Sequence, residues 1–172
     1  MRNILLSCER GMSALARAAL YLASLGLVLM TVIVFAQVVT RYLLGTSLFW
    51  AEPSAVLIMG WFIFLGAAVG IREGSHLSFD VALHYASHRM KVIFHSISDL
   101  AICAFGLGMA VYGTQLAMKA ADNSIPGLGL SRAFDFAPLI GGGVILVIFT
   151  LERLLRRAVG LKTLRFGDLV EE

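Results

Sequence analysis

Four long apolar runs dominate this sequence of 172 residues and constrain its fold more than any other feature. They cover about residues 20–39, 53–71, 97–118 and 136–155. An α-helix rises about 1.5 Å per residue, so about 20 apolar residues cross the roughly 30 Å hydrocarbon core of a bilayer. Because backbone N–H and C=O groups cannot stay unpaired in lipid, each run should be helical. The sequence therefore predicts an all-α integral membrane protein with four transmembrane helices.

The composition supports this class of fold and excludes a soluble one. Hydrophobic residues make up 59% of the chain and charged residues only 15%, and the mean hydropathy is +0.86. The isoelectric point near 9.1 would fit a nucleic-acid partner, but the basic residues flank the apolar runs, where they act as topology signals. We therefore expect one four-helix membrane domain over residues 1–172 and no nucleic-acid partner.

The distribution of lysine and arginine predicts the orientation of the chain. Eleven of them fall in the N-terminal tail, the connection between the second and third runs, and the C-terminal end: Arg2, Arg10, Arg17, Arg72, Arg89, Lys91, Arg153, Arg156, Arg157, Lys162 and Arg165. Three fall on the opposite side: Arg41, Lys119 and Arg132. Cytoplasmic segments carry the excess of lysine and arginine. Both termini are therefore expected in the cytoplasm.

Two segments next to the runs are typical of short interfacial amphipathic helices. Residues 13–20 precede the first run, and residues 79–90 carry apolar side chains at helical spacing opposite polar ones. A helix with one apolar and one charged face lies in the membrane interface with its apolar face in the lipid. An ordinary connecting loop with some helix is the alternative for the second segment.

The sequence indicates neither a metal or cofactor site nor a catalytic centre. His84 and His88 have the i, i+4 spacing that can bind a metal, but all four histidines fall in one connection or at its edge. A solvated polar face explains them. Cys8 and Cys103 have no metal-binding spacing, and neither a nucleophile–base arrangement nor a pair of catalytic carboxylates stands out. We expect a protein without a cofactor that is not an enzyme.

The centres of the four runs carry no charged residue. A charge at mid-membrane is costly and is kept for function. The polar exceptions, Thr31, Gln37, Thr114 and Gln115, fit hydrogen bonds between helices. The chain alone therefore lacks the polar residues that a carrier of polar solutes needs at mid-membrane.

Glycines within the runs predict close helix contacts, because small residues let helix backbones approach. Gly66 and Gly70 stand in the G-x-x-x-G register of the second run. Whether such contacts are internal or made with a partner is left open by the sequence.

A dense group of aromatic, charged and small residues surrounds the second run. Its members are Arg41, Tyr42, Trp50, Glu52, Trp61, Gly66, Gly70, Arg72, His76 and Asp80. The first four mark one membrane boundary, and the last three mark the other. One interpretation is simple anchoring at the two interfaces. The other is that these residues grip a partner protein, and we take them as the candidate interface.

This group resembles the small membrane subunit of tripartite ATP-independent periplasmic (TRAP) transporters, the DctQ-like family. Members have an arginine–tyrosine pair after the first span, a tryptophan–alanine–glutamate element, and a tryptophan-containing second span that ends in arginine, glycine, histidine and aspartate. The matching residues here are Arg41, Tyr42, Trp50, Ala51, Glu52, Trp61, Gly66, Ala67, Ala68, Arg72, Gly74, His76 and Asp80. The chain departs from the family at Pro53, where a second acidic residue often follows the glutamate.

The resemblance implies a role, partners and a location. The small subunit of this family is similar to a scaffold that binds a large membrane subunit carrying the substrate and sodium sites. A periplasmic solute-binding protein captures an organic acid or similar solute and docks on the pair. The resemblance implies a multi-pass protein of the bacterial cytoplasmic membrane, with membrane lipids around it.

Two other functions remain as alternatives at this point. The first is a small carrier or channel that works by itself, which would need polar residues at mid-span. The second is a membrane haem protein of the electron-transfer class, which would need histidines within facing spans.

Overall fold

The structure, a computed structural model, describes residues 2–73 and 88–158 and is all-helical there. Four long helices account for nearly all of this part: α1 (Arg2–Leu43), α2 (Ala51–Arg72), α4 (His88–Ala120) and α5 (Ala137–Ala158). A short 3₁₀ helix, η1 (Arg132–Phe136), leads directly into α5. Each long helix contains a stretch that is long and apolar enough to cross a membrane, so the four predicted spans are confirmed.

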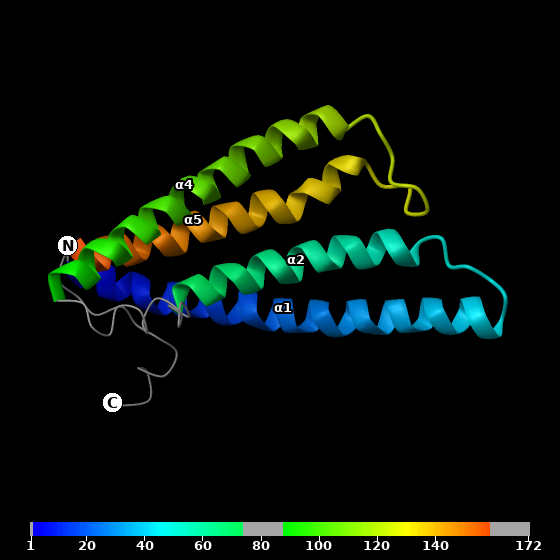
Figure 1. Ribbon diagram of the computed structural model, residues 1–172, viewed down its shortest axis with the longest axis horizontal. Helices are drawn as coiled ribbons and strands as arrows, with labels where there is room; N and C mark the ends of the chain where they lie inside the picture. The colour runs from blue at the N-terminus through cyan, green and yellow to red at the C-terminus, as the bar shows by residue number, and fades with distance from the viewer. Residues whose placement is uncertain (1, 74–87, 159–172) are drawn as a thin grey trace.

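The helices pack in a row in the order α1, α2, α5 and α4, and not in the order of the sequence (Figure 1). The extensive contacts are those of α1 with α2, α2 with α5, and α5 with α4. Helices α1 and α4 run toward the end that carries the connections 44–50 and 121–131, which we call the loop end (Figure 1). Helices α2 and α5 run the opposite way and finish at what we call the cluster end.

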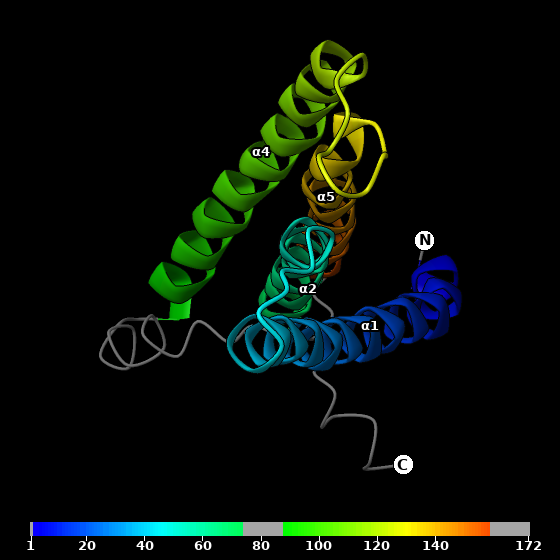
Figure 2. The ribbon, with the colours of Figure 1, turned by 90° about the vertical axis from the view of Figure 1, so that its right-hand side faces the viewer.

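Two helix boundaries differ from the predicted apolar runs. Helix α1 has 42 residues, so the segment 13–20 belongs to one continuous helix with the first span. Helix α4 has 33 residues and begins at His88, well before the run that starts near residue 97. Most of the expected interfacial helix at 79–90 lies outside the described residues. Seen from the loop end, α1 runs obliquely across the row (Figure 2).

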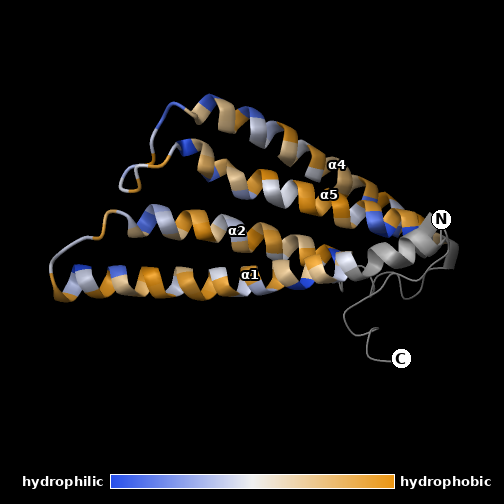
Figure 3. Ribbon diagram, turned by 180° about the vertical axis from the view of Figure 1, so that it is seen from behind, coloured by the Kyte–Doolittle hydropathy of each residue, from blue (hydrophilic) through white to orange (hydrophobic). Residues whose placement is uncertain are grey.

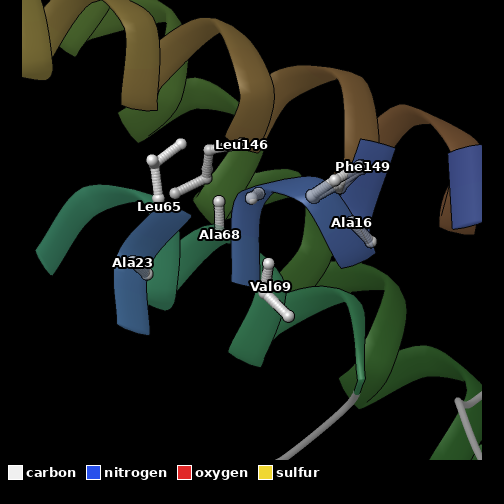
Figure 4. Close-up of a cluster of buried hydrophobic side chains, with 8 residues drawn as sticks. Ala16, Ala23, Leu65, Ala68, Val69, Leu146 and Phe149 are labelled. Atoms are coloured by element: carbon white, nitrogen blue, oxygen red, sulfur yellow. The ribbon is translucent and has the colours of Figure 1, made fainter. Parts of the chain in front are cut away.

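The core lies where α1, α2 and α5 meet. Small side chains from α1 pack there against larger ones from α2 and α5 (Figure 4): Ala16, Ala19, Ala23, Leu65, Ala68, Val69, Leu146 and Phe149. Small residues allow the close helix approach on which packing in a membrane depends. Outside this core the helices are largely apolar, and hydrophilic residues gather toward the helix ends (Figure 3). This pattern matches a protein surrounded by lipid.

Some glycines pack against a neighbouring helix, and others lie beside open space. A Cβ added at Gly143 of α5 would lie 2.8 Å from the carbonyl oxygen of Gly106 in α4, so these two backbones touch. A Cβ at Gly60 of α2 would lie 3.1 Å from Pro138 of α5. A Cβ at Gly66 or Gly70 would meet nothing within 4 Å. The close contacts within the chain are therefore made by other glycines than the G-x-x-x-G pair.

At the loop end, the connection 121–131 is held by its own hydrogen bonds and lies against the connection 44–50. The backbone N–H of Ile125 donates to the carbonyl oxygen of Leu130 at 2.7 Å. Gly127 has a φ of +84°, and a Cβ there would lie 2.4 Å from the carbonyl oxygen of Phe49. Only glycine fits this conformation at this distance, which brings the two connections together.

Candidate functional site

Charged side chains from three helices converge at the cluster end, where α1 adds a serine. We define the charge cluster as Ser13 of α1, Arg72 of α2 with Glu73 beside it, Asp99 of α4, and Glu152, Arg153 and Arg156 of α5. Ser13, Arg72, Asp99, Arg153 and Arg156 are all buried. Three guanidinium and three carboxylate groups balance each other in formal charge. A buried charge is tolerated only when it is paired, and this set of residues meets that requirement within one chain.

Arg72 is the centre of the cluster. Its Nε lies 3.4 Å from Glu152 Oε2 of α5, and its Nη2 donates a hydrogen bond of 3.2 Å to Ser13 Oγ of α1. Its guanidinium also lies over the ring of Phe149, 5.6 Å from the ring centroid. A cation over an aromatic ring is attracted by the ring quadrupole. One side chain at the end of α2 therefore contacts both neighbouring helices.

The other arginines extend the cluster across α5. Arg153 Nη2 lies 3.5 Å from Asp99 Oδ1 of α4, and its Nη1 donates to the backbone carbonyl of Ile71 in α2. Arg156 Nε lies 3.1 Å from Glu152 Oε1 one turn earlier in α5. The carbonyl of Ile71 is in the last turn of α2, where α-helices leave carbonyls without a partner in the helix. The cluster thus joins the ends of α2 and α5 and the early part of α4.

A second feature is the face of α2 that points away from its neighbours. We define the α2 stripe as Glu52, Val56, Met59, Ile63, Gly66 and Gly70, which recur at spacings of three and four residues and so share one face. Glu52 is exposed, as are Val56 at 54% and Ile63 at 46%. The opposite face of α2 carries buried Leu65, Ala68 and Arg72. The stripe is therefore exposed at Glu52, Val56 and Ile63 and partly exposed at Met59, Gly66 and Gly70.

The predicted interface residues separate into distinct environments. At the loop end, Arg41 and Tyr42 finish α1 and are exposed, and Trp50 immediately before α2 is 46% exposed. Trp61 turns toward α5, where its ring would touch a Cβ placed at Gly141 at 3.0 Å. Glu52, Gly66 and Gly70 lie on the α2 stripe. His76 and Asp80 lie outside the described residues.

Arg72 differs from the other predicted interface residues because only 4% of it is exposed. Its partners Ser13 and Glu152 are 59 and 80 residues away in the sequence. Sequence reasoning did not pair them, although Asp99, Glu152 and Arg153 were visible as charges at the margins of apolar runs. The signal in the sequence was the presence of these charged residues at the ends of apolar runs on the same side of the membrane.

Neither feature has the chemistry of a catalytic or metal site. Within residues 2–73 and 88–158, no group of three or more histidine, cysteine, aspartate or glutamate side chains is placed to hold a metal ion. The charge cluster pairs its cations and anions with each other. What the described geometry provides is a row of packed helices in which two glycines of the α2 stripe, Gly66 and Gly70, have open space beside them.

Comparison with known proteins identifies relatives of one kind. Residues 30–160, about three quarters of the chain, match the model of the DctQ component of tripartite ATP-independent periplasmic transporters. The chain is 28% identical over 78 residues to a C4-dicarboxylate TRAP transporter small permease protein of Vibrio cholerae serotype O1. That match covers 45% of this chain but only 34% of the relative.

Two further relatives are matched over more of their length. The sialic acid TRAP transporter small permease protein of Vibrio cholerae serotype O1 is 25% identical over 118 residues, which are 69% of this chain and 68% of the relative. A putative TRAP transporter small permease protein of Haemophilus influenzae is 24% identical over 132 residues, 75% of this chain and 80% of the relative.

Proposed function

Because this chain belongs to the DctQ component family of tripartite ATP-independent periplasmic transporters, we propose that it is the scaffold subunit that holds a large membrane subunit. It is a multi-pass protein of the bacterial inner membrane and a small permease component of such a transporter. In this proposal the large subunit carries the solute and sodium sites, and a periplasmic binding protein delivers an organic acid. Two relatives are named for a C4-dicarboxylate and a sialic acid, both carboxylic acids.

The observation that carries the proposal, beside the family match, is the open α2 stripe. In lipid, small residues on a helix surface gain little unless another helix packs closely against them. Among the residues that the structure describes, nothing lies within 4 Å of a Cβ added at Gly66 or Gly70, whereas Gly106 of α4 and Gly143 of α5 pack against each other. By comparison, the open face of α5 presents Val144, Ile148 and Leu151 without a glycine. We take the stripe as the face for the large subunit.

In the same proposal the cluster end lies in the cytoplasm and the loop end in the periplasm. The excess of lysine and arginine toward the chain termini supports this orientation. Exposed Tyr42, Phe49 and Trp50 at the loop end suit the headgroup region of the membrane. A solute-binding protein arriving from the periplasm would then meet the loop end.

The experiment is affinity purification of the tagged chain from its native membrane in mild detergent, followed by mass spectrometry. We expect a large multi-spanning protein in equal amount. The Gly66→Leu and Gly70→Leu variants should each lower its recovery about tenfold or more, because a leucine side chain blocks close helix approach. Gly108→Leu is the matched control, since Gly108 of α4 also has nothing within 4 Å of an added Cβ.

Each result has a defined meaning. Recovery of the parent chain alone, or only as a homo-oligomer, would refute the scaffold proposal. Loss of the partner in Gly108→Leu but not in the two α2 variants would move the interface from α2 to α4.

A further inference from the structure

We infer that Arg72 acts in assembly as a positioning residue: it holds the α1, α2 and α5 helices in the arrangement that presents the α2 stripe, without touching the partner. This inference rests on the proposed function for the identity of the partner. It differs from the expectation that Arg72 itself grips the partner.

Arg72 is too deeply buried to contact a partner. A residue that is 4% exposed has almost no surface to offer to another protein. Glu52 of the same helix is exposed and lies on the α2 stripe. Arg72 belongs to the opposite face, with Leu65 and Ala68. Any effect of Arg72 on a partner that docks on the stripe must therefore pass through the helix.

The contacts of Arg72 join three helices. It is the residue through which the end of α2 contacts both α1, at Ser13, and α5, at Glu152 and Phe149. Ala16 lies one turn after Ser13 and is fully buried, at 0% exposure, in the core beneath this contact. If the Arg72 contacts are lost, α1 is no longer held at this point by a hydrogen bond to α2.

Loss of Arg72 would unbalance the buried charges of the cluster. Removing one member of a buried pair leaves the other charge without compensation and is strongly destabilising. Replacing Arg72 by glutamine would leave three carboxylates with two guanidinium groups in the charge cluster, and it would remove the cation above Phe149. The ends of the helices would then open so that water reaches the remaining charges. The predicted consequence is exposure of the core next to Ser13.

The test measures this exposure and partner binding on the same full-length chain. In a background with Cys8→Ser and Cys103→Ala, one reporter carries Ala16→Cys in the core and another carries Ala18→Cys on the exposed side of α1. The rate of labelling by a water-soluble maleimide reports whether each thiol is accessible. Co-purification of the large membrane protein is measured in parallel.

We expect Arg72→Gln to raise the labelling rate of the Ala16→Cys thiol about tenfold or more, because a protected group reacts through local opening. The Ala18→Cys thiol should label at an unchanged rate. Partner recovery should fall together with core protection. Arg72→Lys keeps the charge but not the forked geometry, so it should restore both readouts in part. Glu52→Gln is the matched control, which should leave core labelling unchanged.

Alternative outcomes refute the inference in different ways. If Arg72→Gln loses the partner while the Ala16→Cys thiol stays protected, Arg72 contacts the partner directly. If the core opens while the partner is retained, the arrangement of α1 is not needed for docking. If the parent chain itself captures no large membrane protein, the proposed function fails, independently of the labelling result.

A milder variant keeps the test decisive if Arg72→Gln cannot be produced. Ser13→Ala removes only the hydrogen bond from Arg72 Nη2 to α1. It should raise labelling of the Ala16→Cys thiol by a few fold, since one buried hydrogen bond to a charged group is lost. Unchanged labelling in this variant would contradict a positioning role through α1.

Discussion

The contact between Gly143 and Gly106 predicts that the α4–α5 pair will not tolerate even one added methyl group. In Gly143→Ala, the new Cβ would lie 2.8 Å from the carbonyl oxygen of Gly106 and 3.0 Å from the backbone nitrogen of Ala110. Non-bonded heavy atoms prefer separations of about 3.5–4.0 Å. The two helices must therefore separate by roughly half an ångström or more along this contact.

The magnitude follows from two opposing effects. Forcing an additional group into a packed contact costs about 1–3 kcal/mol. Replacing glycine by alanine inside a helix returns up to about 1 kcal/mol of helix propensity. The net result for Gly143→Ala should be a loss of up to about 2 kcal/mol of stability. For Gly70→Ala, where nothing lies within 4 Å of the added Cβ, only the gain in helix propensity remains.

The assay is thermal unfolding in detergent, followed by the fluorescence of Trp50 and Trp61, the two tryptophans of the chain. The Trp61 ring packs against α5 at Gly141, so it reports on separation of the helix row. Gly143→Ala should unfold at a lower temperature than the parent, and Gly70→Ala at the same or a slightly higher one. A Gly143→Ala variant that is as stable as Gly70→Ala would refute the packing argument.

Three further predictions concern the loop end and the charge cluster. Gly127→Ala should cost about 2 kcal/mol or more, because alanine is strained at this φ and its Cβ would meet the carbonyl oxygen of Phe49; thermal unfolding measures it. Asp99→Asn should cost about 3 kcal/mol, because it removes the carboxylate charge that lies 3.5 Å from the buried guanidinium of Arg153; the same unfolding assay applies. Ser131→Ala should cost about 1 kcal/mol, because the hydroxyl caps η1 and also donates to the carbonyl of Ala121, the first residue after α4; limited proteolysis at the connection 121–131 measures its loosening.

Each of these predictions has a control within the chain. Gly129→Ala shares the positive φ of Gly127 but meets nothing within 4 Å, so it should cost less. The double variant Asp99→Asn/Arg153→Gln removes both charges and should be more stable than Asp99→Asn alone. Ser54→Ala is the control for Ser131, since its hydroxyl donates only to the carbonyl of its own helix turn at Trp50. If each control loses as much as its counterpart, the stated contact is not the cause.

The spans were predictable because the lipid sets them locally. Apolar runs near residues 53–71 and 136–155 correspond closely to α2 and α5. The prediction stopped short at α1 and α4, because hydropathy registers only the part of a helix that meets lipid. Turns that continue a helix beyond its apolar span, such as His88–Lys91 at the start of α4, have no such signature.

Helix order and charge pairing were not predictable from spacing. The G-x-x-x-G register of Gly66 and Gly70 correctly marks a shared face, but spacing does not say which neighbour covers it. Arg72 was recognised as a boundary residue, and its burial depends on the end of α5 lying beside it. That proximity follows from the order α1, α2, α5, α4, which is a property of packing between distant segments.

The length of α1 has a consequence for the surrounding bilayer. The candidate span Gly11–Leu43 has 33 residues and measures about 50 Å along the helix axis, against a hydrocarbon core of roughly 30 Å. Arg17 and Arg41 lie within it, about 36 Å apart along the axis, and suit the two interfaces, so most of the excess lies outside the hydrocarbon. Helix α2, with 22 residues, matches the core thickness at about 33 Å. Since α1 crosses the row obliquely (Figure 2), a tilt of this helix would take up the rest, which is how long spans relieve hydrophobic mismatch. A tilted α1 would occupy a wider area of membrane than an upright one, so bilayer thickness becomes a variable that acts on the geometry of the chain.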